Sequence, residues 1–243
     1  MIVSHARKFI FLKTRKTAGT SLEIALSKYC GPDDILTPIN YDEEARNRIA
    51  GIGARNYARP LSRYRPRDFY ARLLGRKPAA WYTEHMMAVE ARERLGEKIW
   101  NEYFKFTIVR NPFDRMVSRY HWTMKMRPCY RERWGVTDLD AFIRYRADFV
   151  NENWLIYTSG DRLMVDDVVR YETRERDLAR ISARVGLDHN LHDDMARINA
   201  KTSFRPRSEQ GDDILRPADQ EIIAALCAKE IELFGYGRAR LAA

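Results

Sequence analysis

The segment from Lys8 to Ser21 constrains the fold more than any other part of the chain. Its apolar run Phe9–Leu12 predicts a short buried strand. A polar loop follows, and a helix is predicted from Leu22, with Thr20 and Glu23 at the spacing of a capping box. A strand, a loop and a helix N-terminus in this order form a geometry that binds phosphate, because free backbone N–H groups and the positive end of the helix dipole converge there.

The loop carries the groups that an anion site requires. Gly19 permits close approach of the backbone, Lys16 supplies a mobile positive charge, and the hydroxyl donors are Thr17, Thr20 and Ser21. The Walker A pattern Gly-x-x-x-x-Gly-Lys-Ser/Thr occurs nowhere in the sequence. The alternative is an ordinary capped helix after an edge strand. Lys16 argues against it, because a cation beside the positive helix end is unfavourable unless an anion is also present.

A second segment has the same organisation. Residues 104–109 predict another buried strand, and Arg110 stands at its carboxyl end, where ligands bind in open α/β sheets. Pro112 then suits the first position of a helix, Asp114 lies in its first turn, and Ser118 lies in its interior. Arg110 therefore either binds a ligand or pairs locally with Asp114, and the sequence leaves both readings open.

Taken together, the two segments resemble the sulfotransferase superfamily, and within it the carbohydrate type (sulfotransferase family 2) that includes heparan and chondroitin sulfotransferases. The matching stretches are Lys16-Thr17-Ala18-Gly19-Thr20-Ser21 and Arg110-Asn111-Pro112-Phe113-Asp114-Arg115-Met116-Val117-Ser118-Arg119-Tyr120. The resemblance extends to residues 96–110, 168–172 and 230–236, so it spans most of the chain, and it is weakest between Asn40 and Ala80. In that family the first loop binds the 5′-phosphosulfate of 3′-phosphoadenosine 5′-phosphosulfate (PAPS). The second segment, with a serine eight residues after the arginine, binds the 3′-phosphate.

The resemblance implies a set of cofactor-binding residues in this chain: Arg15, Lys16, Thr17, Ala18, Gly19, Thr20, Ser21, Arg110, Ser118 and Arg205. Arg205 and Arg207 precede the last predicted helix, where related enzymes have a basic loop over the nucleotide; a solvated loop is the alternative. The sequence departs from the family at Arg15, where proline is usual.

The fold expected from the resemblance is α/β, with three layers, a mainly parallel sheet and a P-loop-kinase-like layout without a Walker A motif. The expected reaction is sulfuryl transfer from PAPS to an acceptor hydroxyl, on a carbohydrate or a glycolipid, with no metal ion. Lys16 would stabilise charge on the leaving phosphate.

Sulfuryl transfer to a hydroxyl also requires a group that accepts the hydroxyl proton. His85 is the preferred candidate, because Thr83 could cap a helix from Glu84 to Leu95 and place His85 in its first turn, where the dipole keeps imidazole neutral. The resembling family also has a histidine base between its two PAPS motifs. Glu84 is the alternative base.

Length and composition favour one domain over residues 1–243, large enough for a full core. The sequence has no apolar run of ~18 residues and no signal-peptide pattern at its start. Its three cysteines are widely spaced and suit a reducing compartment. We therefore expect a cytoplasmic protein.

The net charge of +9 is concentrated in one Arg-rich stretch within residues 40–80. Between Arg46 and Lys77 lie ten basic residues and one acid, Asp68, interleaved with aromatic side chains. This stretch could be a solvated insertion, an acceptor-binding segment or a peripheral contact with an anionic membrane. It also leaves a non-enzymatic nucleic-acid-binding protein as an alternative, although no specific nucleic-acid partner is expected. A P-loop-like kinase is the other alternative.

Overall fold

The computed structural model describes residues 1–40, 43–76, 79–146, 151–198 and 214–237. Its central sheet has the strand order β3-β1-β2-β4-β7. β2, β4 and β7 are parallel, whereas β1 pairs antiparallel with both β2 and β3. These strands are β1 (Ile2–Ser4), β2 (Phe9–Leu12), β3 (Ile35–Leu36), β4 (Phe104–Val109) and β7 (Asp167–Arg170), and a separate hairpin pairs β5 (Thr158–Ser159) with β6 (Arg162–Leu163).

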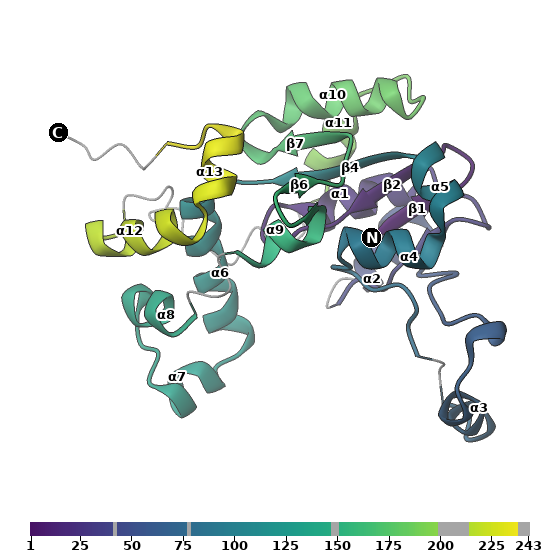
Figure 1. Ribbon diagram of the computed structural model, residues 1–243, viewed down its shortest axis with the longest axis horizontal. Coiled ribbons are helices and arrows are strands. Elements are labelled where there is room, and N and C mark those ends of the chain that lie inside the picture. The colour runs from purple at the N-terminus through teal and green to yellow at the C-terminus, as the bar shows by residue number, and fades with distance from the viewer. Residues whose placement is uncertain (41–42, 77–78, 147–150, 199–213, 238–243) are drawn as a thin grey trace.

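Helices cover both faces of this sheet (Figure 1). The helices near the sheet are α1 (Gly19–Ser27), α2 (Glu43–Ala50), α4 (Ala88–Leu95), α5 (Glu97–Glu102), α9 (Glu152–Tyr157), α10 (Arg174–Arg184) and α11 (Leu191–Ala196). β2 explains the layering, because its side chains alternate between two cores. Phe9 and Phe11 pack in the core that α1, α10 and α11 cover, and Ile10 and Leu12 pack in the opposite core, with residues of α4, α5 and α9. A strand buried on both faces reads as a continuous apolar run.

A third apolar core lies beside the carboxyl ends of the parallel strands. It is formed by α6 (Pro112–Met126), α7 (Cys129–Trp134), α8 (Leu139–Arg146) and α12 (Pro217–Leu226), and α13 (Ala228–Phe234) links it to the sheet. A buried ion pair fixes this connection. Nη1 of Arg115 on α6 lies 2.6 Å from Oε1 of Glu230 on α13, and Nη2 lies 2.6 Å from Oε2. The hydroxyl of Tyr157 on α9 donates to the same Glu230 carboxylate at 3.0 Å.

Part of the Arg-rich stretch leaves the body of the protein. Here η1 (Leu61–Arg63), a short 3₁₀ turn, and α3 (Pro66–Leu73) lie apart from the sheet and its helices (Figure 1). Arg46 of the same stretch is instead fully buried and donates to the carbonyl oxygen of Thr37 at 2.9 Å. The positive charge is therefore divided between the body and a projecting segment. A second 3₁₀ turn, η3 (Tyr171–Thr173), joins β7 to α10.

The sequence-based prediction of a three-layer α/β fold with a mainly parallel sheet is confirmed, with β1 as the antiparallel exception. Among the residues that the structure describes, no helix has both the length and the apolar character needed to cross a membrane.

The Arg115–Glu230 pair yields a stability prediction. Arg115→Met or Glu230→Met alone should lower the free energy of unfolding by about 3–5 kcal/mol, because each removes the opposite charge that compensates the remaining buried one. The double variant Arg115→Met/Glu230→Met should cost less than either single variant. Urea unfolding measures the free energy of unfolding of all three variants. Arg92→Met, which breaks the exposed pair with Glu97, is a control whose free energy of unfolding should differ little from that of the wild type. Additive losses in the double variant would contradict this account.

Candidate functional site

The candidate site lies where the three parallel strands end. Lys13 follows β2, Arg110 follows β4, and Tyr171 follows β7. Carboxyl ends of parallel strands share one edge of a sheet, so three loops that are distant in sequence converge there. Thr107 strengthens the pairing of the first two strands by donating its hydroxyl to the carbonyl oxygen of Leu12 at 2.7 Å.

The loop after β2 has an unusual backbone conformation. Lys16 and Ala18 have φ values of 60° and 64°, in the left-handed region that side-chain-bearing residues rarely adopt. α1 then begins at Gly19, and its N-cap residue Ala18 makes no side-chain capping hydrogen bond. Alternating left- and right-handed residues before a helix N-terminus form a concavity lined by backbone N–H groups, which binds anions.

The predicted capping box is therefore wrong. The helix begins three residues before Leu22, and Glu23 is not used to cap it. Glu23 is fully buried. Its Oε2 forms an ion pair with Lys13 Nζ at 2.8 Å, and its Oε1 accepts a hydrogen bond from the amino group of Met1 at 2.9 Å. Burial raises the pKa of Glu23, but these two positive groups more than offset that effect and hold it below its ordinary value.

Lys13 is the centre of this buried cluster. Its ammonium group also lies 2.5 Å from Oε1 of Glu84, so one cation joins β2 to α1 and to the turn before α4. This arrangement leaves little room for a side chain at Gly19. A Cβ atom on Gly19 would lie 3.0 Å from Cγ of Lys13 and 3.3 Å from the carbonyl oxygen of Thr14. A larger residue here would therefore have to displace the Lys13 side chain or the Thr14 carbonyl group.

His85 is close to the loop, but not for the reason that the sequence suggested. α4 begins at Ala88, with Met87 as its N-cap, so His85 lies in a turn before the helix and not in its first turn. Nδ1 of His85 lies 2.9 Å from the carbonyl oxygen of Lys13. A carbonyl only accepts hydrogen bonds, so Nδ1 carries the proton and Nε2 of the neutral ring holds a lone pair.

The environment of His85 keeps the ring neutral. Burial is the largest cause, and the positive charges of Arg15 and Lys13 add to it, so the pKa of His85 lies well below 6.5. Glu84 differs, because its carboxylate is bound by Lys13 and also accepts the backbone N–H of Asn40 at 3.3 Å. Of the two candidate bases, only His85 presents an uncharged nitrogen acceptor.

Arg110 makes the local contact that the sequence left open and reaches the first loop as well. Its Nε donates to Oδ2 of Asp114 at 2.6 Å, and its Nη1 donates to the carbonyl oxygen of Lys16 at 3.3 Å. The guanidinium carbon lies 4.2 Å from the centre of the Tyr171 ring. Asp114 thus orients the guanidinium between the two loops without removing it from the site. Ser118 lies one helical turn beyond Asp114, on the same face of α6.

The remaining predicted residues divide into three groups. Thr17 is fully buried, and its hydroxyl contacts that of Thr14 at 2.9 Å, which makes it a support of the loop. Thr20 and Ser21 lie in the first turn of α1. Arg205, with Arg207, lies outside the described residues. Within the described ranges, no group of three or more His, Cys, Asp or Glu side chains could hold a metal ion.

Additional positive charge lies beside Lys16. Nε of Arg15 is 2.8 Å from Oε2 of Glu152, and Arg119 is 3.7 Å from the same carboxylate. The ring of Trp122 on α6 is 5.5 Å from Lys16 Nζ and 5.5 Å from the Arg119 guanidinium carbon. Burial, followed by repulsion from Arg15, lowers the pKa of Arg119 to about 10 despite the attraction of Glu152.

Sequence reasoning missed several residues of this site: Lys13, Glu23, Trp122, Glu152 and Asn153. Asn153 holds the backbone of Arg15 from both sides, accepting its N–H at 2.8 Å and donating to its carbonyl oxygen at 2.9 Å. The sequence did contain a signal for Lys13 and Glu23, because each is a charged residue next to apolar residues of a strand or helix that is predicted to be buried. Asn153 lies far away in sequence and carried none.

Comparison with known proteins gives three findings. A family model described as the sulfotransferase family matches residues 1–237. An uncharacterized protein of Archaeoglobus fulgidus is 31% identical over 116 residues, which are 44% of this chain and 87% of that protein. The crystal structure of a sulfotransferase from Alicyclobacillus acidocaldarius aligns with 95% of this chain and 96% of its own, at 20% identity and a TM-score of 0.36.

The buried neutral ring of His85 predicts a pH dependence of stability. As the pH falls below 6.5, the unfolded chain binds a proton at this position and the folded chain does not, so stability falls by up to about 1.4 kcal/mol per pH unit until the folded pKa is reached. His85→Asn retains a donor for the Lys13 carbonyl but does not titrate. Urea unfolding of both proteins between about pH 7.5 and 5 should therefore show a shallower loss in the variant. Parallel curves would contradict the assignment of a depressed pKa to His85.

Proposed function

The chain belongs to the sulfotransferase family, and from this premise we propose that it transfers the sulfuryl group of PAPS to a hydroxyl group of an acceptor. One observation carries the proposal. Arg110 donates to the carbonyl oxygen of Lys16 at 3.3 Å, which places the two predicted phosphate-binding segments side by side although 94 residues separate them. A donor with a negative group at each end requires such a pair of neighbouring cationic sites.

The residues present fit such a donor. The left-handed backbone at Lys16 and Ala18, followed by the N-terminus of α1, suits the 5′-phosphosulfate. Arg110 and Ser118 suit the 3′-phosphate, because a guanidinium forms strong paired hydrogen bonds with phosphate oxygens. The ring of Tyr171 fixes the plane of the guanidinium.

PAPS supplies the sulfuryl group: the new bond joins its sulfur to the acceptor oxygen, and the 5′-phosphate keeps the electron pair of the broken S–O bond. The ammonium group of Lys16 stabilises the negative charge that grows on this phosphate. Nε2 of His85 accepts the proton of the acceptor hydroxyl. Its Nδ1–H bond to the Lys13 carbonyl fixes the tautomer that this step requires.

His85 is preferred over Glu84 as the base for an electrostatic reason. The Glu84 carboxylate neutralises Lys13 inside the protein, and protonating it would leave the Lys13 charge with a weaker buried partner. His85 gains its proton without breaking an ion pair, and its low pKa keeps it unprotonated at neutral pH.

A saccharide or glycolipid is the proposed acceptor. Trp122 lies within 5.5 Å of Lys16 Nζ, so an aromatic face adjoins the position at which the sulfuryl group would be transferred. Such a ring offers apolar contact to the C–H face of a sugar while leaving its hydroxyls to polar groups.

A transfer assay with labelled PAPS across saccharide, lipid, peptide and small-molecule hydroxyls tests both the reaction and the acceptor class. Stabilisation by ATP with magnesium, and not by 3′-phosphoadenosine 5′-phosphate, would favour a kinase.

Recognition of the 3′-phosphate yields a binding prediction. The bisphosphate 3′-phosphoadenosine 5′-phosphate should bind more tightly than AMP by roughly 1.5–3 kcal/mol, about ten- to a hundredfold. Arg110→Ala should remove most of this preference, whereas Arg184→Ala, which removes an exposed arginine on α10, should retain it. Calorimetric titration measures both ligands. Equal affinity of the wild-type protein for both would overturn the assignment of Arg110.

Lys16 yields a kinetic prediction. Because it acts on charge that develops during transfer, Lys16→Ala should lower kcat on the order of a hundredfold while changing donor affinity much less. Lys28→Ala is a matched control, since Lys28 pairs with Asp194 on α11. Steady-state rates and the affinity for 3′-phosphoadenosine 5′-phosphate separate the two effects. A variant with near-wild-type kcat would move the catalytic role away from Lys16.

A further inference from the structure

The projecting helix α3 has its polar side turned toward the protein. Asp68 is only 4% exposed, and its Oδ2 lies 2.8 Å from Nη1 of Arg59. The backbone N–H of Arg65 donates to the same oxygen at 2.8 Å and, together with Arg59, lowers the pKa of Asp68. Arg59 in turn lies 5.4 Å from the ring of Trp81, which packs against the core. The Arg59–Asp68 ion pair therefore anchors this helix.

The apolar side of the same helix faces outward. Phe69, Tyr70, Leu73 and Leu74 are 56%, 65%, 83% and 51% exposed, and Leu61 of η1 is 61% exposed. At 100° per residue, Phe69, Tyr70 and Leu73 occupy the face of the helix opposite Asp68, and Leu74 follows as the C-cap residue. Exposed single leucines are ordinary, but an inverted amphipathic helix leaves a continuous apolar face in water.

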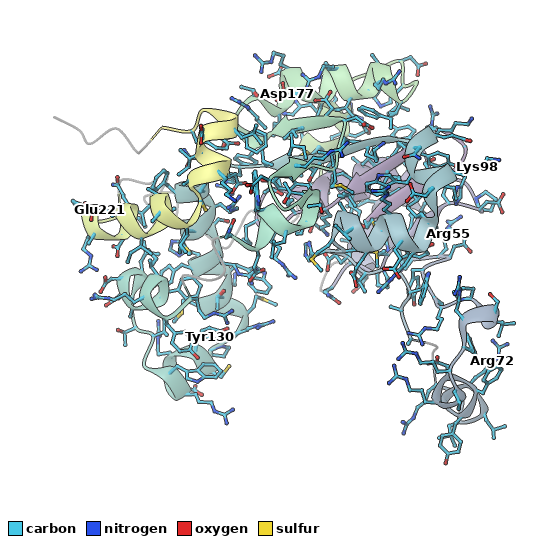
Figure 2. All side chains as sticks on the ribbon, viewed as in Figure 1. Arg55, Arg72, Lys98, Tyr130, Asp177 and Glu221 are labelled. Atoms are coloured by element: carbon cyan, nitrogen blue, oxygen red, sulfur yellow. The ribbon has the colours of Figure 1, made fainter. Side chains whose placement is uncertain are left out.

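Arginines border this face. Exposed arginines of the segment are Arg63, Arg65, Arg67, Arg72 and Arg76. Asp68 is the sole acidic residue between Arg59 and Arg76, and Arg59 already neutralises it. Figure 2 shows Arg72 on the segment that projects away from the sheet. The segment thus presents an apolar face with a basic border, away from the candidate site.

We propose that η1 and α3 together form an arm that docks on an anionic lipid surface. Burial of the apolar face in the headgroup region and attraction of the arginines to anionic lipids are the two terms that bind interfacial helices. A nucleic acid or polysaccharide would satisfy the arginines but leave Leu61 and Leu73 in water. A second copy of the arm would bring two strongly basic surfaces together. Lipid is the partner that satisfies both features, and this proposal goes beyond the sulfuryl-transfer reaction.

Vesicle co-sedimentation of the full chain, without donor or acceptor, tests the arm. Vesicles of phosphatidylcholine with phosphatidylglycerol should bind it, those of phosphatidylcholine alone should bind it much less, and salt should weaken binding. Arg63→Gln/Arg67→Gln/Arg72→Gln should reduce binding about a hundredfold, at about fivefold per arginine. Tyr70→Ser/Leu73→Ser should reduce it by about tenfold or more through lost burial.

Matched controls remove equivalent groups elsewhere. Arg131→Gln/Arg133→Gln/Arg184→Gln and Leu226→Ser/Leu233→Ser change exposed residues of other helices and should bind vesicles like the wild type. An unchanged melting temperature and retained affinity for 3′-phosphoadenosine 5′-phosphate show that an arm variant is folded. If the double apolar variant melts lower, Leu73→Ser alone repeats the test at the most exposed position.

Several results would overturn the proposal. They are equal binding to neutral and anionic vesicles, losses in the controls as large as those in the arm variants, and full vesicle binding by Tyr70→Ser/Leu73→Ser. If the protein binds heparin or RNA with an affinity that Tyr70→Ser/Leu73→Ser does not change, and does not bind anionic vesicles, the partner of the arm would be a polyanion. If sedimentation velocity shows a dimer that Leu73→Ser dissociates, and the protein again does not bind vesicles, the arm would be a contact with a second copy of the chain.

Discussion

The buried ammonium group of Lys13 is the interaction on which the site depends. It lies between the carboxylates of Glu23 and Glu84, and its backbone carbonyl accepts the Nδ1–H of His85. A buried charge is tolerated only when it is fully paired, so moving any partner costs several kcal/mol, about 3–5 by analogy with other buried pairs. One residue therefore fixes the end of β2, the start of α1 and the orientation of the imidazole. The loop above it can hold its left-handed residues because the structure beneath it is rigid.

The sequence predicts the elements that form the candidate site well, and the reasons are local. The strand Phe9–Leu12, the loop after it and the strand Phe104–Val109 are encoded by neighbouring residues, and both strands form as predicted. The roles of Glu23 and His85 are different. Glu23 has the spacing of a cap, but a buried lysine recruits it, and His85 is neutral because of burial and nearby cations instead of a helix dipole. Contacts between residues distant in sequence determine the roles of both Glu23 and His85, and a local sequence pattern does not predict such contacts.

The Arg-rich stretch illustrates a further limit of sequence reasoning. Composition alone treats its arginines as equivalent, yet Arg46 is fully buried, Arg59 binds Asp68, and Arg72 faces the solvent. Burial, pairing and exposure are different physical states of the same side chain, with very different consequences for function. Only the fold separates the arginines that hold the chain together from those available to a partner.

The strand order has a consequence for how the protein reaches its active form. β2 pairs with β4 through Phe9 and Phe104, and β4 pairs with β7 through Phe106 and Asp167, so the sheet under the site joins segments far apart in the chain. Contacts of such long sequence separation require closure of large loops and slow the folding of a domain. During synthesis, a chain that has not yet reached β7 lacks Tyr171 beside Arg110. If the proposed donor binds beside Arg110, its affinity would therefore depend on completion of the last parallel strand, and it would stabilise the chain only late in folding.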